Sequence, residues 1–385
     1  MRTVYFDNNA TTKVAQEVFE EMQPYFCELY GNPSSMHIFG GQVGAKIRHA
    51  REQVAGLLRC DPSELIFTSC GTESDNTAIR GALAAQPQRR KLITSRVEHP
   101  AVLAVCRQME DHGYHVVEIG VDQQGRLNME ELEREVDDDT ALVTIMYANN
   151  ETGTVFPVDQ IAELASSRGV VFHTDAVQAV GKIPLNLSES RFDMLSLSGH
   201  KLHAPKGIGI LYIRKGTRLL PFMVGGHQES GRRAGTENVP GIIGLGKACE
   251  LAGKNIDQEN SRVKYLRDKL ESAILETCPD CRINGDSDNR LPNTTNISFE
   301  YIEGEAILLM LDHFGICASS GSACTSGSLE PSHVLRAMGV PFTAAHGSIR
   351  FSLSRYNTEQ EVDYTIEKIP AIINRLRELS PFVTP

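Results

Sequence analysis

The chain has 385 residues, of which 41% are hydrophobic and 23% are charged, and its formal net charge at pH 7 is −11. This composition is typical of a soluble globular protein with two or three domains, and the negative charge argues against broad nucleic-acid binding because phosphate backbones attract basic surfaces. No apolar run approaches the roughly 20 residues that span a bilayer, and the opening MRTVYFDNNATT lacks the apolar core of a secretory signal, so we expect a cytoplasmic protein with no membrane and no nucleic-acid partner.

Short apolar runs alternate with amphipathic stretches through the middle of the chain. The runs are rich in isoleucine, leucine and valine with little alternation, which predicts strands that are buried on both faces. The predicted strands are 64–69, 91–95, 115–120, 141–148, 170–176, 193–198 and 207–213. Helical patterns between them, such as 73–85, 100–113 and 158–169, predict an α/β fold with a mostly parallel sheet and helices on both faces.

The pattern changes after about residue 255. A charged helix comes first and shorter elements follow, which together predict a smaller α+β domain. The elements are 259–277, 293–300, 305–315, 347–354 and 358–379. Because chain ends are often neighbours, we expect the first residues to join this domain. The prediction is therefore a large domain at 16–254 and a small domain made of 1–15 and 255–385.

Polar residues follow the predicted strands, at the edge of a parallel sheet where ligands bind. Gly71 and Thr72 lie between a strand and a helix, where a tight turn, a hydroxyl and free backbone N–H groups favour an anion site. His99 precedes the next helix, and a capping or packing role is its alternative. Asn150 lies in a polar turn that could also be a plain loop.

The next two strands end on charged and polar residues as well. Asp175 lies at a strand end, where a buried carboxylate is costly unless a positive group pairs with it, and Gln178 follows. Ser198, His200 and Lys201 follow the strand after that; this lysine is either a solvated surface charge or an amine held for covalent chemistry.

One ligand needs the whole set of groups, pyridoxal 5′-phosphate. Its phosphate needs helix N–H groups and hydroxyls, its ring nitrogen needs a carboxylate, its O3′ needs amide donors, and its aldehyde needs a lysine. The strand ends therefore predict a pyridoxal phosphate site.

Longer motifs extend over nearly the whole chain. They are YFDNNATT (5–12), YGNPSSMH (30–37), GTESDN (71–76), VEHPAV (97–102), NNETGT (149–154), HTDAVQAVGK (173–182), SLSGHKLHAPKGIG (196–209), RRAGTEN (232–238), SSGSACTSGSLEPSHVLRAMG (319–339) and IRFSLSRYNTEQEVD (349–363). In this order they resemble the cysteine desulfurases of the NifS/IscS-like branch, in the class V aminotransferase group of fold-type I pyridoxal phosphate enzymes. The motif SGSLEPSHV favours the nitrogenase-associated NifS type.

The resemblance implies a role for each residue at a strand end. Lys201 would form the Schiff base with the cofactor, His99 would stack on its ring and handle protons, and Asp175 would pair with the ring nitrogen. The residues expected at O3′ are Asn150 and Gln178, and those expected at the phosphate are Gly71, Thr72, Ser198 and His200.

The resemblance also implies a second subunit and a substrate site. Thr236 matches a threonine that completes the phosphate site from the other subunit, so we expect a homodimer. Arg350 matches the arginine that binds the substrate carboxylate, for which its planar fork is suited. Asn8, Ala10 and Asn32 lie in stretches that border the substrate pocket of similar proteins.

Cys324 lies at 318–332 among serine, glycine, alanine and threonine residues, a composition that buries little apolar area and is expected to move. By composition alone this segment is a surface connector. The resemblance implies instead that Cys324 takes sulfur from L-cysteine, which leaves L-alanine and a persulfide for an iron–sulfur scaffold protein in nitrogenase maturation. No intrinsic metal is expected, although Cys324 could bind an iron–sulfur cluster transiently.

Other interpretations stay open. A selenocysteine lyase or an aminotransferase would use the same cofactor without a persulfide on Cys324, and a thiol-based iron–sulfur or metal-binding protein would not be an enzyme. The nine cysteines are scattered and odd in number, which is typical of reduced thiols. Cys278 and Cys281 lack a second pair nearby to complete a zinc site, so ordinary cysteines near a turn are preferred over metal or redox use.

Overall fold

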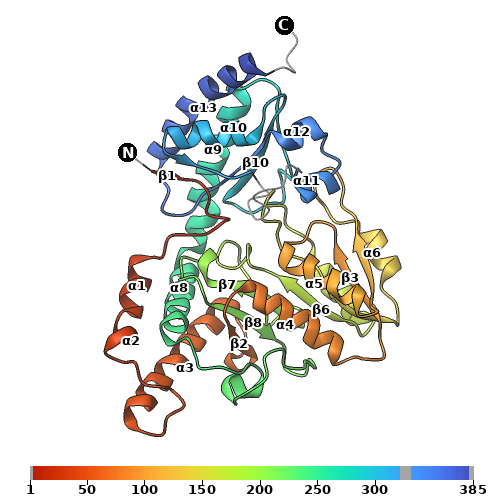
Figure 1. Cartoon of the computed structure of the whole chain (residues 1–385), viewed down its shortest axis with the longest axis vertical. Helices are drawn as coiled ribbons and strands as arrows, with labels where there is room; N and C mark the ends of the chain where they lie inside the picture. Colours follow the sequence, from red (N-terminus) through yellow and green to blue (C-terminus); the bar gives the residue numbers. More distant parts are fainter. Residues whose placement is uncertain (1–2, 321–330, 381–385) are drawn as a thin grey trace.

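A seven-stranded sheet forms the centre of the larger part of the fold. The computed structural model describes residues 3–320 and 331–380, and Figure 1 shows the sheet in its lower part. The strands are β2 (Leu65–Thr68), β3 (Lys91–Ser95), β4 (His115–Ile119), β5 (Thr140–Thr144), β6 (Val171–Asp175), β7 (Met194–Ser198) and β8 (Gly209–Ile213). They lie in the order β2-β8-β7-β6-β5-β3-β4. β8 is antiparallel to both of its neighbours and the other pairs are parallel, so the predicted mostly parallel sheet is confirmed.

Two apolar cores cover the two faces of this sheet. Successive strand residues point to opposite faces, so Leu65 and Phe67 pack in one core and Ile66 packs in the other. The core of Ile66 includes residues of α4 (Gly71–Ala84) and α5 (Pro100–Asp111). The opposite core includes residues of α1 (Gln16–Met22), α2 (Pro24–Cys27), α3 (Ile38–Leu58), α6 (Met129–Glu135), α7 (Val158–Ser167) and α8 (Val239–Gln258).

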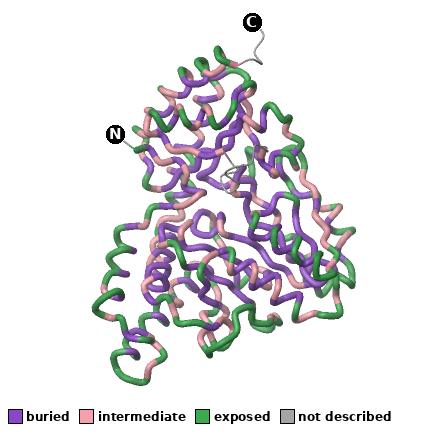
Figure 2. The backbone as a smooth tube through the Cα atoms, viewed as in Figure 1, coloured by how far each residue is buried: buried purple, intermediate pink, exposed green. Residues whose placement is uncertain are grey.

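Burial on both faces explains why the strand sequences show little alternation between apolar and polar residues. Figure 2 shows the buried residues concentrated in the sheet and the exposed residues on the outer helices. Short 3₁₀ turns complete this part, namely η1 (Pro62–Glu64), η2 (Gly199–Lys201) and η3 (Gln228–Gly231).

Most of the remaining elements pack around a third apolar core at the top of Figure 1. Its strands are β1 (Val4–Tyr5), β9 (Cys281–Ile283), β10 (Thr294–Phe299), β11 (Ile316–Cys317) and β12 (Ser348–Ser352). Its helices are α9 (Lys264–Thr277), α10 (Gly304–His313) and α13 (Glu359–Leu379). The short helices α11 (His333–Ala337) and α12 (Phe342–His346) instead place buried residues in the larger core on the sheet. β10 pairs antiparallel with β12 and β9, while β1 pairs parallel with β11. Val4 and Phe6 pack in this core, so the first strand lies with the C-terminal elements.

A continuous helical segment joins the two parts. α8 continues through a π-helical turn, η4 (Glu259–Val263), into α9. The predicted domain boundary after residue 254 falls inside this segment. Among the described residues, no helix combines the length and the apolar character that a membrane crossing requires.

Candidate active site

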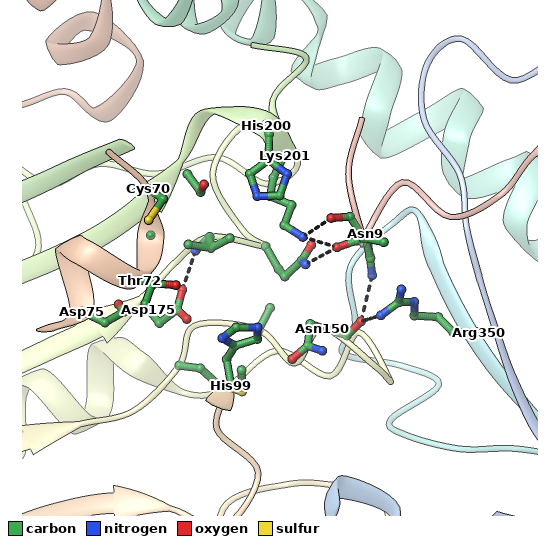
Figure 3. A pocket seen from close by; sticks show the side chains of 17 residues that line it. Asn9, Cys70, Thr72, Asp75, His99, Asn150, Asp175, His200, Lys201 and Arg350 are labelled. Carbon is green, nitrogen blue, oxygen red and sulfur yellow. Dashed lines mark hydrogen bonds between the residues drawn. The ribbon is translucent and has the colours of Figure 1, made fainter. Parts of the chain in front are cut away.

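A cavity of about 290 Å³ lies where the parallel strands end, and residues from both parts of the chain line it (Figure 3). Its lining brings together most of the residues predicted from the sequence. These are Ala10, Gly71, Thr72, His99, Asn150, Asp175, Gln178, Ser198, His200, Lys201 and Arg350. The lining also includes Asn9, Cys70, Asp75, Met146, Ala148 and Val177, which were not predicted as site residues.

Four predicted residues are not in that lining. Asn8 donates from Nδ2 to the carbonyls of Ser352 and Tyr5, at 2.9 and 3.2 Å, and its neighbour Asn9 lines the cavity in its place. Asn32 and Thr236 are exposed on the described surface. Cys324 lies outside the described residues.

Asn8 and Asn9 face opposite ways because the backbone at this point is held in register. Asp7 forms a bridge with Ser352, and the N–H of Asn8 donates to the Ser352 carbonyl at 3.0 Å. Asn9 Nδ2 donates to Thr294 Oγ1 at 2.9 Å and to the Asn150 carbonyl at 3.2 Å, on the cavity side. The sequence motif alone does not reveal this alternation.

The first turn of α4 and the end of β7 form a seat for an anion. Gly71 opens α4, and a Cβ there would lie 2.8 Å from Val177 Cγ2, so only glycine fits without displacement. Cys70 provides no side-chain cap, which leaves the helix N–H groups for a ligand. Ser198 Oγ is buried and has no hydrogen-bond partner within the described part of the chain. A phosphate would satisfy both sets of donors.

Lys201 enters the cavity from the 3₁₀ turn that follows β7. Its Nζ donates to the carbonyl oxygens of Asn9 and Ala10, at 2.5 and 2.8 Å. These two carbonyls come from the N-terminal segment, so the lysine joins the two parts of the chain at the cavity. The arrangement holds an amine beside the anion seat.

His99 is the N-cap of α5, and Pro100 occupies the first helical position. Its Nδ1 accepts the N–H of Ala101 at 3.1 Å, which places the proton of the neutral ring on Nε2. Burial, and then the charges of Lys201 and His333, lower the pKa of His99 to about 4. The histidine is therefore neutral at pH 7 and holds its proton on a defined atom.

Asp175 is a buried carboxyl at the end of β6. Its Oδ1 accepts the N–H of Val177 at 2.9 Å. Burial raises the pKa of Asp175 to about 6, although the Val177 hydrogen bond and the charge of Lys201 oppose the increase. A protonated ring nitrogen beside this carboxyl would stabilise its ionised form, which is the pairing expected for pyridoxal phosphate.

Asp75 is a second buried carboxyl in the cavity wall, on α4 (Figure 3). Burial, and then the charge of Asp175, raise the pKa of Asp75 well above its usual range. Its Oδ1 has no hydrogen-bond partner among the described residues, and His173 Nε2 lies 3.8 Å away. The sequence did contain a signal, because Asp75 falls on the helix face shared with Ala78 and Ile79, where a charge is out of place.

Glu98 is a third buried carboxyl, next to His99. Its Oε1 accepts hydrogen bonds from Ser95 Oγ and the Met146 N–H, at 2.6 and 2.9 Å. Burial raises the pKa of Glu98 to about 8. Burial therefore favours the neutral forms of Asp75 and Glu98 more strongly than that of Asp175, which the charge of Lys201 helps to keep ionised.

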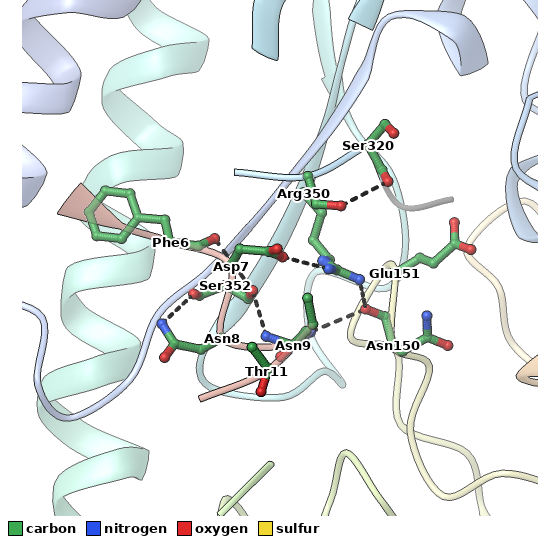
Figure 4. A network of polar contacts seen from close by, with 12 residues as sticks. Phe6, Asp7, Asn8, Asn9, Thr11, Asn150, Glu151, Ser320, Arg350 and Ser352 are labelled. Carbon is green, nitrogen blue, oxygen red and sulfur yellow. Dashed lines mark hydrogen bonds and ion pairs between the residues drawn. The ribbon is translucent and has the colours of Figure 1, made fainter. Parts of the chain in front are cut away.

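Arg350 lies in the opposite wall, on β12, and is 3% exposed (Figure 4). Its Nη1 donates to the Asn150 carbonyl at 2.9 Å and its Nη2 to Asp7 Oδ1 at 2.7 Å. Its Nε has no hydrogen-bond partner in the part of the chain that is described. Asp7 and Asn150 thus hold the guanidinium in a fixed orientation at the cavity, as anion binding requires.

The Cys278 and Cys281 pair lies away from the cavity. A hydrogen bond from Cys281 lowers the pKa of Cys278 to about 7. Within residues 3–320 and 331–380 there is no group of three or more histidine, cysteine or acidic side chains that could hold a metal ion.

Comparisons with known proteins agree with this geometry. The family model of class-V aminotransferases matches residues 4–365. A cysteine desulfurase of Trichormus azollae is 64% identical over 382 residues, which cover 99% of this chain and 96% of the relative. The cysteine desulfurase NifS of Azotobacter vinelandii is 59% identical over 383 residues, with 99% and 95% covered. A solved NifS-like protein superposes with a TM-score of 0.92 at 42% identity and covers 97% of this chain and 100% of its own.

Proposed function

Because this chain belongs to the class-V aminotransferase family, and its full-length relatives are cysteine desulfurases, we propose that it removes sulfur from L-cysteine and collects it on Cys324. The overall change is balanced: L-cysteine and the Cys324 thiol give L-alanine and a Cys324 persulfide. The enzyme depends on pyridoxal 5′-phosphate, as this family and NifS do. The observation that carries the proposal is that Lys201, Asp175 and His99 line one cavity.

The residues of the cavity fit the cofactor. The open N-terminus of α4 suits its phosphate, as does the Ser198 hydroxyl, which has no hydrogen-bond partner among the described residues. Asp175 suits its ring nitrogen, Gln178 its phenolic oxygen and Lys201 its aldehyde. When bound, pyridoxal phosphate supplies an electron sink that weakens bonds at the Cα of an amino acid.

The other side chains act on the substrate and its protons. Arg350 binds the carboxylate of L-cysteine, and its fixed guanidinium orients the amino acid in the cavity. His99 is neutral at pH 7: it can donate a hydrogen bond from Nε2, and it can take up a proton at Nδ1 if the Ala101 hydrogen bond breaks.

The flanks of the segment that contains Cys324 support its role. On one side, Ser319 and Arg350 exchange backbone hydrogen bonds of 2.6 and 3.2 Å. On the other side, Ser332 Oγ donates to the buried carboxylate of Glu151, which follows the cavity residue Asn150. Ser319 and Ser332, which flank this segment, therefore both contact residues at or next to the cavity.

The assembly and the sulfur acceptor belong to the same proposal. A homodimer would bring Thr236 of a second subunit to the phosphate, which is consistent with its exposure in the single chain. The acceptor would be an iron–sulfur scaffold protein, and the similarity to NifS favours nitrogenase maturation. The cytoplasmic location stays a prediction from the sequence.

The proposal is tested with purified protein and its Cys324→Ala variant. We expect both proteins to be yellow and to lose the colour with borohydride, and only the unchanged protein to release sulfide and alanine from cysteine and a thiol. Cys317→Ala, a half-buried thiol on β11, is the matched control and should keep full activity.

Each alternative predicts a different result. Full activity of Cys324→Ala with selenocysteine, or transamination without sulfide, would indicate another reaction of the same cofactor. A colourless protein that carries iron or zinc would contradict an enzyme of this class.

A further inference from the structure

Lys182 is a buried lysine that the proposed function does not use. It follows Gly181 in the loop after β6 and is 6% exposed. Burial of an ammonium group is strongly unfavourable, because the group loses its hydration, unless nearby groups compensate. We therefore expect the Lys182 ammonium to have a hydrogen-bond acceptor nearby.

The partner of Lys182 is a residue of the cavity wall. Its Nζ donates to Gln178 Oε1 at 2.8 Å. Gln178 Nε2 donates in turn to the carbonyl of Asn9 at 3.0 Å, and the same carbonyl accepts from Lys201 Nζ at 2.5 Å. A hydrogen-bonded chain thus connects Lys182 to Lys201.

The chemistry of the ammonium group decides how the Gln178 amide is oriented. A lysine ammonium can only donate and the Asn9 carbonyl can only accept, so the two contacts together place the amide oxygen toward Lys182 and the nitrogen toward Asn9 and the cavity. The nitrogen carries two hydrogens and uses one on the Asn9 carbonyl. With an apolar side chain at position 182, only the Asn9 carbonyl would select this amide orientation.

The charges around Lys182 are mixed. Burial, and then the charge of Lys201, lower the pKa of Lys182 to about 7, while the buried carboxylate of Glu259 opposes the decrease. The titratable and charged groups that interact electrostatically with Lys182 are Lys201, Glu259, Arg350, His200 and His203. Positive groups predominate on this side of the cavity.

We propose that Lys182 is a positioning residue, which holds the Gln178 amide with its nitrogen toward the cofactor and adds a positive charge behind it. This inference rests on the proposed pyridoxal phosphate site. Gln178 then acts as a hydrogen-bond donor to the phenolic oxygen side of the cofactor, and the charge disfavours further protonation in the cavity.

The test compares Lys182→Met, which removes the donor and the charge, with Lys182→Gln, which removes the charge and keeps a donor. Lys91→Met is the matched control, because Lys91 is equally buried and pairs with Asp137 at the far end of β3. Each apo protein is titrated with pyridoxal phosphate, and the visible absorbance of the holoenzyme is followed against pH.

We expect Lys182→Met to bind pyridoxal phosphate about tenfold more weakly, because the Gln178 amide is less firmly held and its hydrogen bond to the cofactor is weakened or lost. The pH midpoint of the absorbance should rise by roughly half a unit or more, because one positive neighbour is gone. Lys182→Gln should show the rise in midpoint while it keeps most of the affinity. Lys91→Met should match the unchanged protein in both measurements.

Two outcomes would overturn the inference without touching the function. One is a Lys182→Met protein with unchanged affinity and midpoint. If Lys182→Met does not fold, the inference is overturned by a Lys182→Gln protein whose absorbance has an unchanged pH midpoint. If the unchanged protein fails to bind pyridoxal phosphate, the proposed function itself is contradicted.

Discussion

The two walls of the cavity are built in different ways. On the sheet side, His99, Asp175 and Lys201 lie at or after the ends of three different strands of the seven-stranded sheet. On the opposite side, Asn9 and Arg350 come from the two ends of the chain and are held by Asp7 and Asn150. The comparison suggests that the sheet side fixes the cofactor and its chemistry, while the other side selects and orients the substrate.

A change on the sheet side should have the largest effect. Lys201→Ala removes the amine from the cavity, and we expect alanine production to fall roughly a thousandfold or more, because Lys201 is the only lysine among the described residues that line the cavity. Product is measured by chromatography, and cofactor retention by absorbance after dialysis. Lys206→Ala is the matched control, since Lys206 is exposed five residues further along the same loop. Equal loss in both variants would contradict a special role for Lys201.

A change on the substrate side should separate binding from cofactor chemistry. Arg350→Lys keeps the charge but loses the planar fork, so we expect the KM for L-cysteine to rise about tenfold to a hundredfold while the bound cofactor is retained. Steady-state kinetics measure the change. Arg290→Lys is the control, because Arg290 forms a similar two-bond pair with Glu271 outside the cavity and should leave KM unchanged. A lower kcat with an unchanged KM would contradict the assignment of this wall to substrate binding.

The smallest effect on activity is expected at Asp75. Its folded-state pKa is raised, so the unchanged protein binds an extra proton when folded and loses stability as pH rises above about 4, the unfolded pKa. Asp75→Asn mimics the neutral carboxyl and does not lose that contribution. The variant should therefore gain in Tm over the unchanged apo protein as pH increases from 4 to 8, with activity within about threefold.

Thermal unfolding at a series of pH values measures this difference. Asp159→Asn, on the outer part of α7, is a control in which the carboxyl is more accessible and the gain should be smaller. A gain in Tm that is largest at low pH would contradict a neutral Asp75.

Much of the sheet side could be predicted from the sequence because strand ends have a local signature. The apolar runs before Asp175 and Ser198 mark buried strands, and parallel strands bring their carboxyl ends to one edge. The predicted α/β fold followed from the same pattern. Asp75 was not predicted because only strand ends were searched for site residues, although a charge on the apolar face of a helix was a signal for it.

The opposite wall depends on contacts between distant segments. Whether Asn8 or Asn9 faces the cavity is decided by the bridge between Asp7 and Ser352, which no local pattern contains. The same is true of the Asp7 contact that orients Arg350. α3 was not predicted either, although Val43, Ile47, Val54 and Leu58 recur at helical spacing on its buried face.

The most direct measurement is mass analysis of peptides from the holoenzyme after brief exposure to L-cysteine. We expect one extra sulfur atom on the peptide that contains Cys324, lost on treatment with a reducing thiol and absent from the Lys201→Ala variant. Alanine formation without any sulfur on that peptide, or sulfur found only on other cysteines, would contradict a transfer from the cavity to Cys324.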